Sequence, residues 1–199
     1  KAAGITDWRA HGLSRPPITE LLAMHEIYEI GAMAGCDAHV VHCSLSRGYD
    51  IAAAYRTQGF TATVECCIHY LVLDEEHDVR RLGGKAKINP PVRPRAEVEG
   101  LWRQVAAGHI WLVSTDHVSW TADRKTDPDM LANASGVPGL EAMVPLFVKG
   151  ALERGVPLTS AARLMSANPA RHFRIDDRKG NLAAGLDADI IVMTPEPYV

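Results

Sequence analysis

Two polar residues stand where buried strands are expected to end. Asp116 follows the apolar run 110–113, and His42 closes a short run that begins at Ala38 and is β-branched at its centre. The carboxyl end of a parallel strand holds a side chain rigidly while the loop beyond opens to solvent, so α/β proteins place chemistry there. Imidazole nitrogen and carboxylate oxygen are zinc ligands, and a catalytic site takes them from separate strands. The pair predicts part of a metal site, although a turn residue at Asp116 and a hydrogen-bonded histidine at His42 are the simpler alternatives.

Helices are expected between these strands. The longer ones are predicted over 16–34, 44–58, 96–107 and 139–154. In the first of them, helical spacing places four apolar residues on one face, Ala23, Ile27, Ile30 and Ala34. Thr159 is expected to cap a short helix that ends near Met165, and Asn168 to cap another that begins at Pro169.

Three strands of the parallel type are predicted, over 38–43, 61–65 and 110–113, and a closing strand over 190–193. Strands that alternate with helices indicate βαβ units and a parallel sheet, so the predicted fold class is α/β. A complete (β/α)₈ barrel needs about 250 residues and eight strands. The chain is therefore expected to be either a small open sheet or a piece of something larger.

Composition excludes several classes of protein. The chain has 199 residues, 47% of them hydrophobic and 23% charged, which is typical of a soluble globular domain. A net charge of −3 with dispersed Lys and Arg argues against a nucleic-acid or membrane-surface partner. No apolar stretch approaches the roughly 20 residues that span a bilayer. The four cysteines lack a C-x-x-C spacing, so reduced thiols and a cytoplasmic location are expected.

Seven short motifs run along the chain, at 39–44, 65–71, 87–93, 114–117, 136–141, 168–170 and 179–189. In type and order they resemble those of the cyclic amidohydrolases, the group that contains allantoinase, hydantoinase/dihydropyrimidinase and dihydroorotase. The resemblance covers nearly the whole chain. The Asn-Pro-Pro-x-Arg form at 89–93 and the Glu-x-Cys-x-His-Tyr form at 65–70 look most like the allantoinase branch.

The resemblance implies a fold and a place within it. The chain is expected to be the carboxyl-terminal half of a metal-dependent enzyme, with residues 1–180 forming the last strands and helices of a partial (β/α)₈ TIM-type barrel. Residues 181–199 are expected to form a linker and the strand that returns to a small β-sandwich domain.

The resemblance also assigns roles to particular residues. It implies two zinc ions, bridged by a carboxylated lysine that this chain does not contain, with His42 as the last histidine ligand and Asp116 as the carboxylate ligand. Asp116 is then also the general base, which takes a proton from the attacking hydroxide and passes it to the leaving nitrogen. His69 and His117 are expected to support the site without binding metal. Asn89, Ser135 and Gly136 align with contacts to the cyclic substrate, although a rigid turn and a glycine loop are the simpler interpretations.

The implied activity is hydrolysis of a ring C–N bond in a ureide, hydantoin or dihydropyrimidine. The expected partners are a small cyclic amide and further copies of the protein, since relatives are often tetramers. The isolated chain is expected to bind metal poorly and to be inactive, because the remaining metal ligands should lie upstream. Ile68 and the run 118–120 depart from the family pattern and leave the substrate open.

Two alternatives stay open. One is a non-catalytic scaffold or interaction protein that kept the barrel and lost the metals, against which the retention of both His42 and Asp116 argues mildly. The other is a self-contained open-sheet binding domain.

Overall fold

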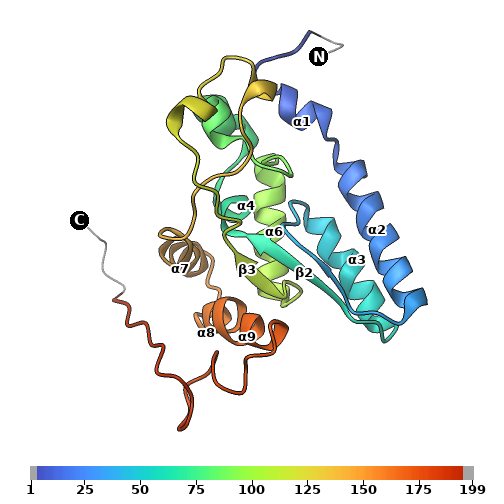
Figure 1. Ribbon diagram of the computed structural model, residues 1–199, viewed down its shortest axis with the longest axis vertical. Coiled ribbons are helices and arrows are strands. Elements are labelled where there is room, and N and C mark those ends of the chain that lie inside the picture. The colour runs from blue at the N-terminus through green and yellow to red at the C-terminus, as the bar shows by residue number, and fades with distance from the viewer. Residues whose placement is uncertain (1–3, 195–199) are drawn as a thin grey trace.

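A three-stranded parallel sheet organises the computed structural model, which describes residues 4–194 (Figure 1). Its strands are β1 (Ala38–Val40), β2 (Ala62–Cys67) and β3 (Leu112–Ser114), paired in the order β1-β2-β3. Neighbours in sequence are therefore also neighbours in the sheet. The predicted α/β class and the three parallel strands are confirmed, with strand bounds that differ by up to three residues.

Side chains of β2 alternate between two different environments. Ala62, Val64 and Cys66 are buried, whereas Thr63 and Glu65 between them are only partly buried. Because successive side chains of a strand point to opposite faces, one face of β2 belongs to the hydrophobic core and the other carries polar groups. Glu65 stands on this polar face, opposite Leu112 of β3 in the register.

Helices cover the apolar side of the sheet. Figure 1 shows the three longest running side by side, and contacts join α2 to α3 and α3 to α6. The helices are α1 (Ala10–Ser14), α2 (Pro17–Ala34), α3 (Ser46–Thr57), α4 (Ile68–Val72), α5 (Arg80–Leu82), α6 (Arg95–Ala107), α7 (Met143–Glu153), α8 (Thr159–Ala162) and α9 (Asn168–His172). Short 3₁₀ turns lie over 83–86, 122–125 and 130–132, and π turns over 75–79 and 163–167. None of the helices in residues 4–194 is long and apolar enough to cross a membrane.

The start of α7 differs from the prediction by four residues. The pattern predicts a helix from Gly139, but α7 begins at Met143. A helix from Gly139 would place Pro145 in its interior, where proline lacks the required N–H and clashes with the preceding turn. Beginning at Met143 moves Pro145 into the first turn, where its missing N–H costs nothing.

The orientation of α2 corrects an expectation. Its buried residues are Met24, Tyr28 and Gly31, whereas Ile27 and Ile30 of the predicted apolar face are 46% and 57% exposed. The Tyr28 hydroxyl donates to the backbone oxygen of Thr63 at 2.7 Å, so the tyrosine turns its own face of α2 toward the sheet. The apolar face of α2 is left uncovered by residues 4–194.

Two further expectations near the carboxyl end were wrong. Asn168 does not cap a helix, because the π turn over 163–167 runs directly into α9 and gives Asn168 helical dihedrals; its amide donates instead to the Trp111 backbone oxygen at 2.6 Å. Residues 190–193 form no strand, and their side chains are at least half exposed. No neighbouring strand among residues 4–194 offers them a ladder of hydrogen bonds. The rest of the expected strand region, 195–199, lies outside the described residues.

Candidate metal centre

His42 and Asp116 share an unusual backbone conformation. His42 lies two residues beyond β1 and has φ +44°, and Asp116 lies two residues beyond β3 and has φ +43°. In residues 4–194 the only other non-glycine residue with positive φ is Arg174. Such backbones cost roughly 1–3 kcal/mol each and cluster at functional sites, where the surrounding structure must hold them. The His42 turn also ends β1 three residues earlier than the sequence predicts.

The carboxylate of Glu65 connects the two turns. Its Oε1 accepts from the His42 backbone N–H at 3.3 Å and from the Ser114 hydroxyl at 2.6 Å. Its Oε2 lies 3.9 Å from Nε2 of His39. Burial raises the pKa of Glu65, but hydrogen bonds from His39, Ser114 and His42 outweigh it, so the pKa lies below its usual value. Glu65 is therefore an ionised brace between both candidate ligand turns, a role that sequence reasoning missed.

The His42 turn is held from its other side by a buried ion pair. Arg93 Nη2 lies 3.0 Å from Oε2 of Glu20, and Arg93 Nε donates to the Ser44 hydroxyl at 3.0 Å. Glu20 also accepts from the Ser44 backbone N–H at 2.7 Å. Ser44 is thus clamped between α2 and the segment after Asn89, which fixes the chain two residues beyond His42.

The His69 ring lies close to His42 and has no hydrogen-bond partner among residues 4–194. It is 4% exposed, and neither ring nitrogen is bonded to any group in residues 4–194. Burial, with a smaller contribution from His42, lowers the pKa of His69 to about 4, so the ring is neutral at physiological pH. Buried polar groups are almost always paired in native proteins. An imidazole without a partner is therefore expected if the polar group that completes this site is not among residues 4–194.

The donors at this edge of the sheet suit zinc in kind but are incomplete in number. His42 is partly buried and Asp116 is exposed, and they offer one imidazole and one carboxylate. Within residues 4–194 no group of three or more His, Cys, Asp or Glu side chains is arranged to hold a metal ion. Zinc sites take three or four protein ligands. His42 and Asp116 therefore fit part of such a site.

The three residues expected at the substrate lie on loops that are joined to each other. Gly136 N–H donates to the backbone oxygen of Lys87 at 2.9 Å, which places the loop of Ser135 and Gly136 beside the segment that leads to Asn89. Trp120 donates its indole N–H to the Ser135 oxygen at 2.8 Å. Both loops therefore have fixed positions relative to one another.

His117 ties the same loop to the Asp116 turn. Its Nδ1 accepts from the Gly139 N–H at 3.1 Å, so its remaining proton is on Nε2 in the neutral ring. A β-bridge joins His117 to Val137, and Val118 N–H donates to the Val137 oxygen at 3.0 Å. The turn of Asp116, the loop of Gly136 and the segment of Asn89 thus form one connected rim.

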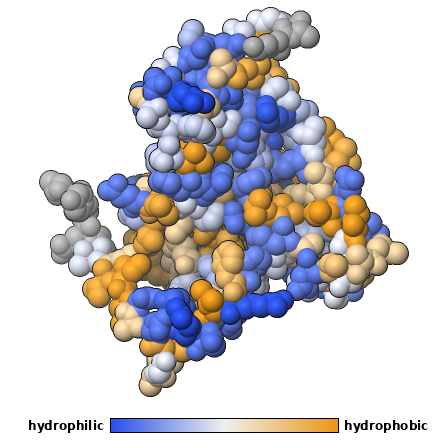
Figure 2. All heavy atoms as spheres, viewed as in Figure 1, coloured by the Kyte–Doolittle hydropathy of each residue, from blue (hydrophilic) through white to orange (hydrophobic). Residues whose placement is uncertain are grey.

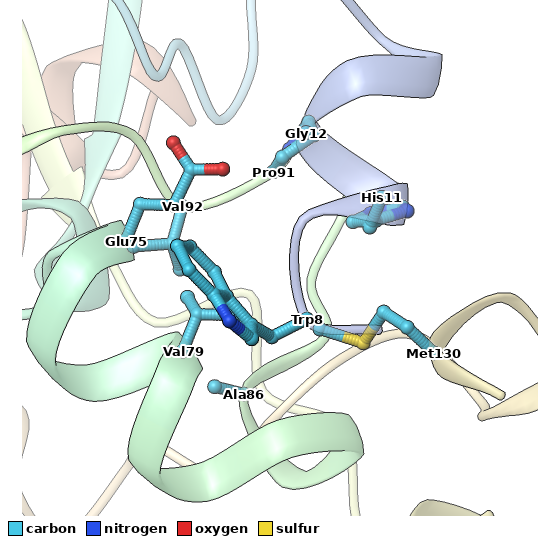
Figure 3. Close-up of a pocket in the computed structure, with 9 residues that line it drawn as sticks. All are labelled: Trp8, His11, Gly12, Glu75, Val79, Ala86, Pro91, Val92 and Met130. Atoms are coloured by element: carbon cyan, nitrogen blue, oxygen red, sulfur yellow. The ribbon is translucent and has the colours of Figure 1, made fainter. Parts of the chain in front are cut away.

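Two hollows lie near these elements. A cavity of about 10 Å³ between α1 and the segment 75–92, crossed by the Trp8 indole (Figure 3), has room for about one water and includes none of the candidate residues. A groove of about 500 Å³ runs between α2 and the edge of β1 that no strand within residues 4–194 pairs with. It is lined by His42 and Pro90 and by apolar residues that include Met24, Ile27, Ile30 and Val40. Figure 2 shows hydrophobic residues gathered along α2, on the right of that view.

Comparison with known proteins gives concordant results. The model of the amidohydrolase family matches residues 13–198. An allantoinase of Rubrobacter xylanophilus is 40% identical over 191 residues, which are 96% of this chain and 42% of that protein. A dihydroorotase of Halobacterium salinarum is 37% identical over 190 residues, 95% of this chain and 42% of that protein.

Solved structures agree with the sequence relatives. An L-hydantoinase (dihydropyrimidinase) from Arthrobacter aurescens superposes with a TM-score of 0.90 at 29% identity, over 94% of this chain and 42% of that one. A D-hydantoinase gives a TM-score of 0.87 at 31% identity over the same shares. The chain thus spans about two fifths of the proteins it matches.

Proposed function

Because the chain belongs to the amidohydrolase family, we propose that the whole protein hydrolyses the ring C–N bond of a cyclic amide. The first candidate substrate is a ureide of the kind that allantoinases hydrolyse, and hydantoins or dihydropyrimidines are the next candidates. One observation carries the proposal. His42 and Asp116 follow strands on either side of β2, both have left-handed backbones, and the Glu65 carboxylate hydrogen-bonds to His42 itself and to Ser114, two residues before Asp116. The allantoinase and dihydroorotase relatives and the hydantoinase structures support this class of substrate.

The chain is proposed to form the last part of a (β/α)₈ barrel. In a (β/α)₈ barrel the parallel strands lie side by side in the order in which they occur in the sequence, whereas in a doubly wound sheet the strand order reverses direction. The polar face of β2, with Glu65 on it, would then face the barrel interior. The unpaired edge of β1 and the apolar groove beside it would be covered by earlier strands and helices of the whole protein.

The proposed chemistry needs a base beside a polarised amide. His42 and Asp116 would hold divalent metal, zinc being our first candidate, together with ligands from other parts of the protein. Bound there, the metal would supply a water of lowered pKa and would polarise the amide carbonyl. Asp116 would accept the proton of the attacking water and release it to the leaving ring nitrogen. Asn89, Ser135 and Gly136 would hydrogen-bond the ring, and His117 would fix the loop beside Asp116.

Activity of the full-length protein tests this proposal. The protein is assayed with allantoin, hydantoin, dihydrouracil and dihydroorotate, and its metal content is measured. Asp116→Asn is expected to reduce turnover by about 10²–10⁴-fold, the typical contribution of a general base. Asp177→Asn, at an exposed aspartate on the loop after α9, serves as the matched control.

The isolated chain provides the complementary test. It is expected to bind zinc weakly and to hydrolyse none of these compounds, because only part of the ligand set is present. If the full-length protein binds no metal and hydrolyses none of the four rings, the non-catalytic scaffold becomes the better interpretation.

A further inference from the structure

Lys125 is a buried lysine whose three donors are all used by backbone oxygens. It is 7% exposed, and its Nζ donates to the oxygens of Lys87 at 2.9 Å, Ala134 at 3.0 Å and Gly136 at 2.6 Å. An ammonium group has three N–H bonds, so its hydrogen-bonding capacity is complete. Burial, with a smaller contribution from Lys87, lowers the pKa of Lys125 to about 8.

These acceptors belong to two separate segments. Lys87 belongs to the segment that continues to Asn89. The other two acceptors, the oxygens of Ala134 and Gly136, lie on either side of Ser135 in the loop 134–136. The same Lys87 oxygen accepts from the Gly136 N–H, so Lys125 and Gly136 meet on one acceptor. The Lys87 amine reaches back to the Leu131 oxygen at 2.8 Å and the Asn133 oxygen at 2.5 Å. Two buried amines therefore cross-link the two loops that carry the substrate candidates.

The carbonyl of Ser135 does not accept a hydrogen bond from Lys125. Ser135 lies between the two loop acceptors, and its oxygen accepts instead from the Trp120 indole, whose side chain is 41% exposed. Lys125 thus fixes the backbone on both sides of Ser135 while the Ser135 carbonyl stays beside an exposed aromatic ring. Backbone groups held this way are suited to recognising the N–H and C=O groups of a ring amide.

We propose that Lys125 is a positioning residue for substrate binding: its ammonium holds the Ser135–Gly136 loop against the Asn89 segment and so sets the geometry of the substrate contacts. This inference rests on the proposed function. If Lys125 only stabilised the fold, its replacement would lower the free energy of unfolding and leave the affinity for substrate unchanged. The two roles differ in KM.

The test uses the full-length protein and three substitutions. Lys125→Met keeps an unbranched side chain that is one atom shorter and removes all donors. Lys125→Gln retains an amide with two N–H donors on a shorter side chain, and it is used if the Met variant does not fold. Lys85→Met, at an exposed lysine of the 83–86 turn, is the control. Steady-state kinetics on the best ring substrate are combined with hydrogen–deuterium exchange of peptides covering 87–89 and 134–137.

The expected result separates binding from chemistry. In the Lys125 variant, KM should rise about tenfold or more while kcat stays within about threefold, because substrate contacts and not the base are displaced. Amide exchange should rise in both segments and stay unchanged over β2. Lys85→Met should match the wild type in both measurements.

Three outcomes decide the matter. Unchanged amide exchange in the two segments would overturn the proposal. Raised exchange with an unchanged KM would also overturn it, because Lys125 would then only stabilise the fold. Raised exchange in a protein whose wild type hydrolyses no cyclic amide would support the link between the loops and would count against the proposed function.

Discussion

His42 and Asp116 occupy equivalent places on the two outer strands of the sheet, each two residues beyond its strand and each with φ near +44°. The Glu65 carboxylate reaches both turns from the strand between them, through the His42 N–H and the Ser114 hydroxyl. A left-handed backbone turns the chain sharply, so at each of these residues the chain leaves the direction of its strand. The turn of His42, the end of β3 and the Glu65 carboxylate thus form one hydrogen-bonded unit.

Neutralising Glu65 should loosen that unit. Glu65→Gln in the full-length protein keeps the shape of the side chain but loses the charge that the surrounding donors stabilise. Zinc affinity is expected to fall about 10–100-fold, as it does when groups that orient metal ligands are changed. Competition with a chelator measures this, with Glu29→Gln on the exposed side of α2 as control. Equal zinc affinity in all three proteins would show that the brace is irrelevant to the ligands.

Replacing His69 should separate stability from activity. Its ring nitrogens have no partners in residues 4–194, so His69→Leu removes a buried polar group without breaking a hydrogen bond. An unpaired buried polar group costs about 1–3 kcal/mol, and the free energy of unfolding of this chain should stay equal or rise. Urea unfolding followed by tryptophan fluorescence measures this. Turnover of the full-length protein should nevertheless fall; a clear loss of stability in the isolated chain would mean that His69 has a structural partner.

Acid should destabilise the chain through two buried histidines. Burial lowers the pKa of His11 and of His69 to about 4 each. Between pH 6.5 and about 4 the unfolded chain binds protons that the folded chain does not, so the free energy of unfolding falls as the pH falls through that window. The effect is on the order of 3 kcal/mol per histidine. Unfolding curves at pH 7, 5.5 and 4 should show it, and His69→Leu should reduce the slope by about half.

Much of this architecture could be predicted from the sequence because it depends on local pattern. Alternating helices and strands gave the parallel sheet, and α2 runs from Pro17 to Ala34 much as proline and glycine signals predict. His42 and Asp116 were selected as candidates because each follows its own predicted strand, and their roles as ligands stay predictions. Such features can be predicted from residues that are close together in the sequence.

What the sequence could not reveal depends on contacts between distant segments. The role of Glu65 follows from a register that pairs it with Leu112 and leaves the Ser114 hydroxyl, two residues further along β3, within hydrogen-bond distance of its carboxylate. The role of Lys125 follows from two loops that meet around its amine. The buried face of α2 was missed because helical spacing alone does not say which residues meet the sheet: the Tyr28 hydroxyl reaches a carbonyl of β2, while Ile27 and Ile30 stay exposed among residues 4–194. The one available signal was that Glu65 is the only charged residue of β2.

The bond from Tyr28 to β2 can be tested on its own. Tyr28→Phe removes only the hydroxyl that donates to Thr63 and should lower the free energy of unfolding by about 1 kcal/mol, the usual worth of such a bond. Tyr55→Phe, whose hydroxyl bonds the exposed Glu29, is the control and should cost less. Equal losses in both variants would show that the buried Tyr28 bond contributes no more to stability than the exposed Tyr55 bond.

The uncovered face of α2 predicts association of the isolated chain. Ile27 and Ile30 line the apolar groove beside β1, and exposed apolar surface next to an unpaired strand edge favours association. Ile27→Lys combined with Ile30→Lys should lower the mass of the particles seen by sedimentation. Leu158→Lys, at an apolar residue 45% exposed outside this groove, should not. An isolated wild-type chain that stays monomeric at high concentration would contradict this prediction.

The most direct measurement is zinc-edge anomalous diffraction from crystals of the full-length protein. Anomalous peaks are expected at about 2.0–2.2 Å from an imidazole nitrogen of His42 and from a carboxylate oxygen of Asp116. Peaks with neither residue among their ligands, or a fully active protein without such peaks, would contradict this expectation.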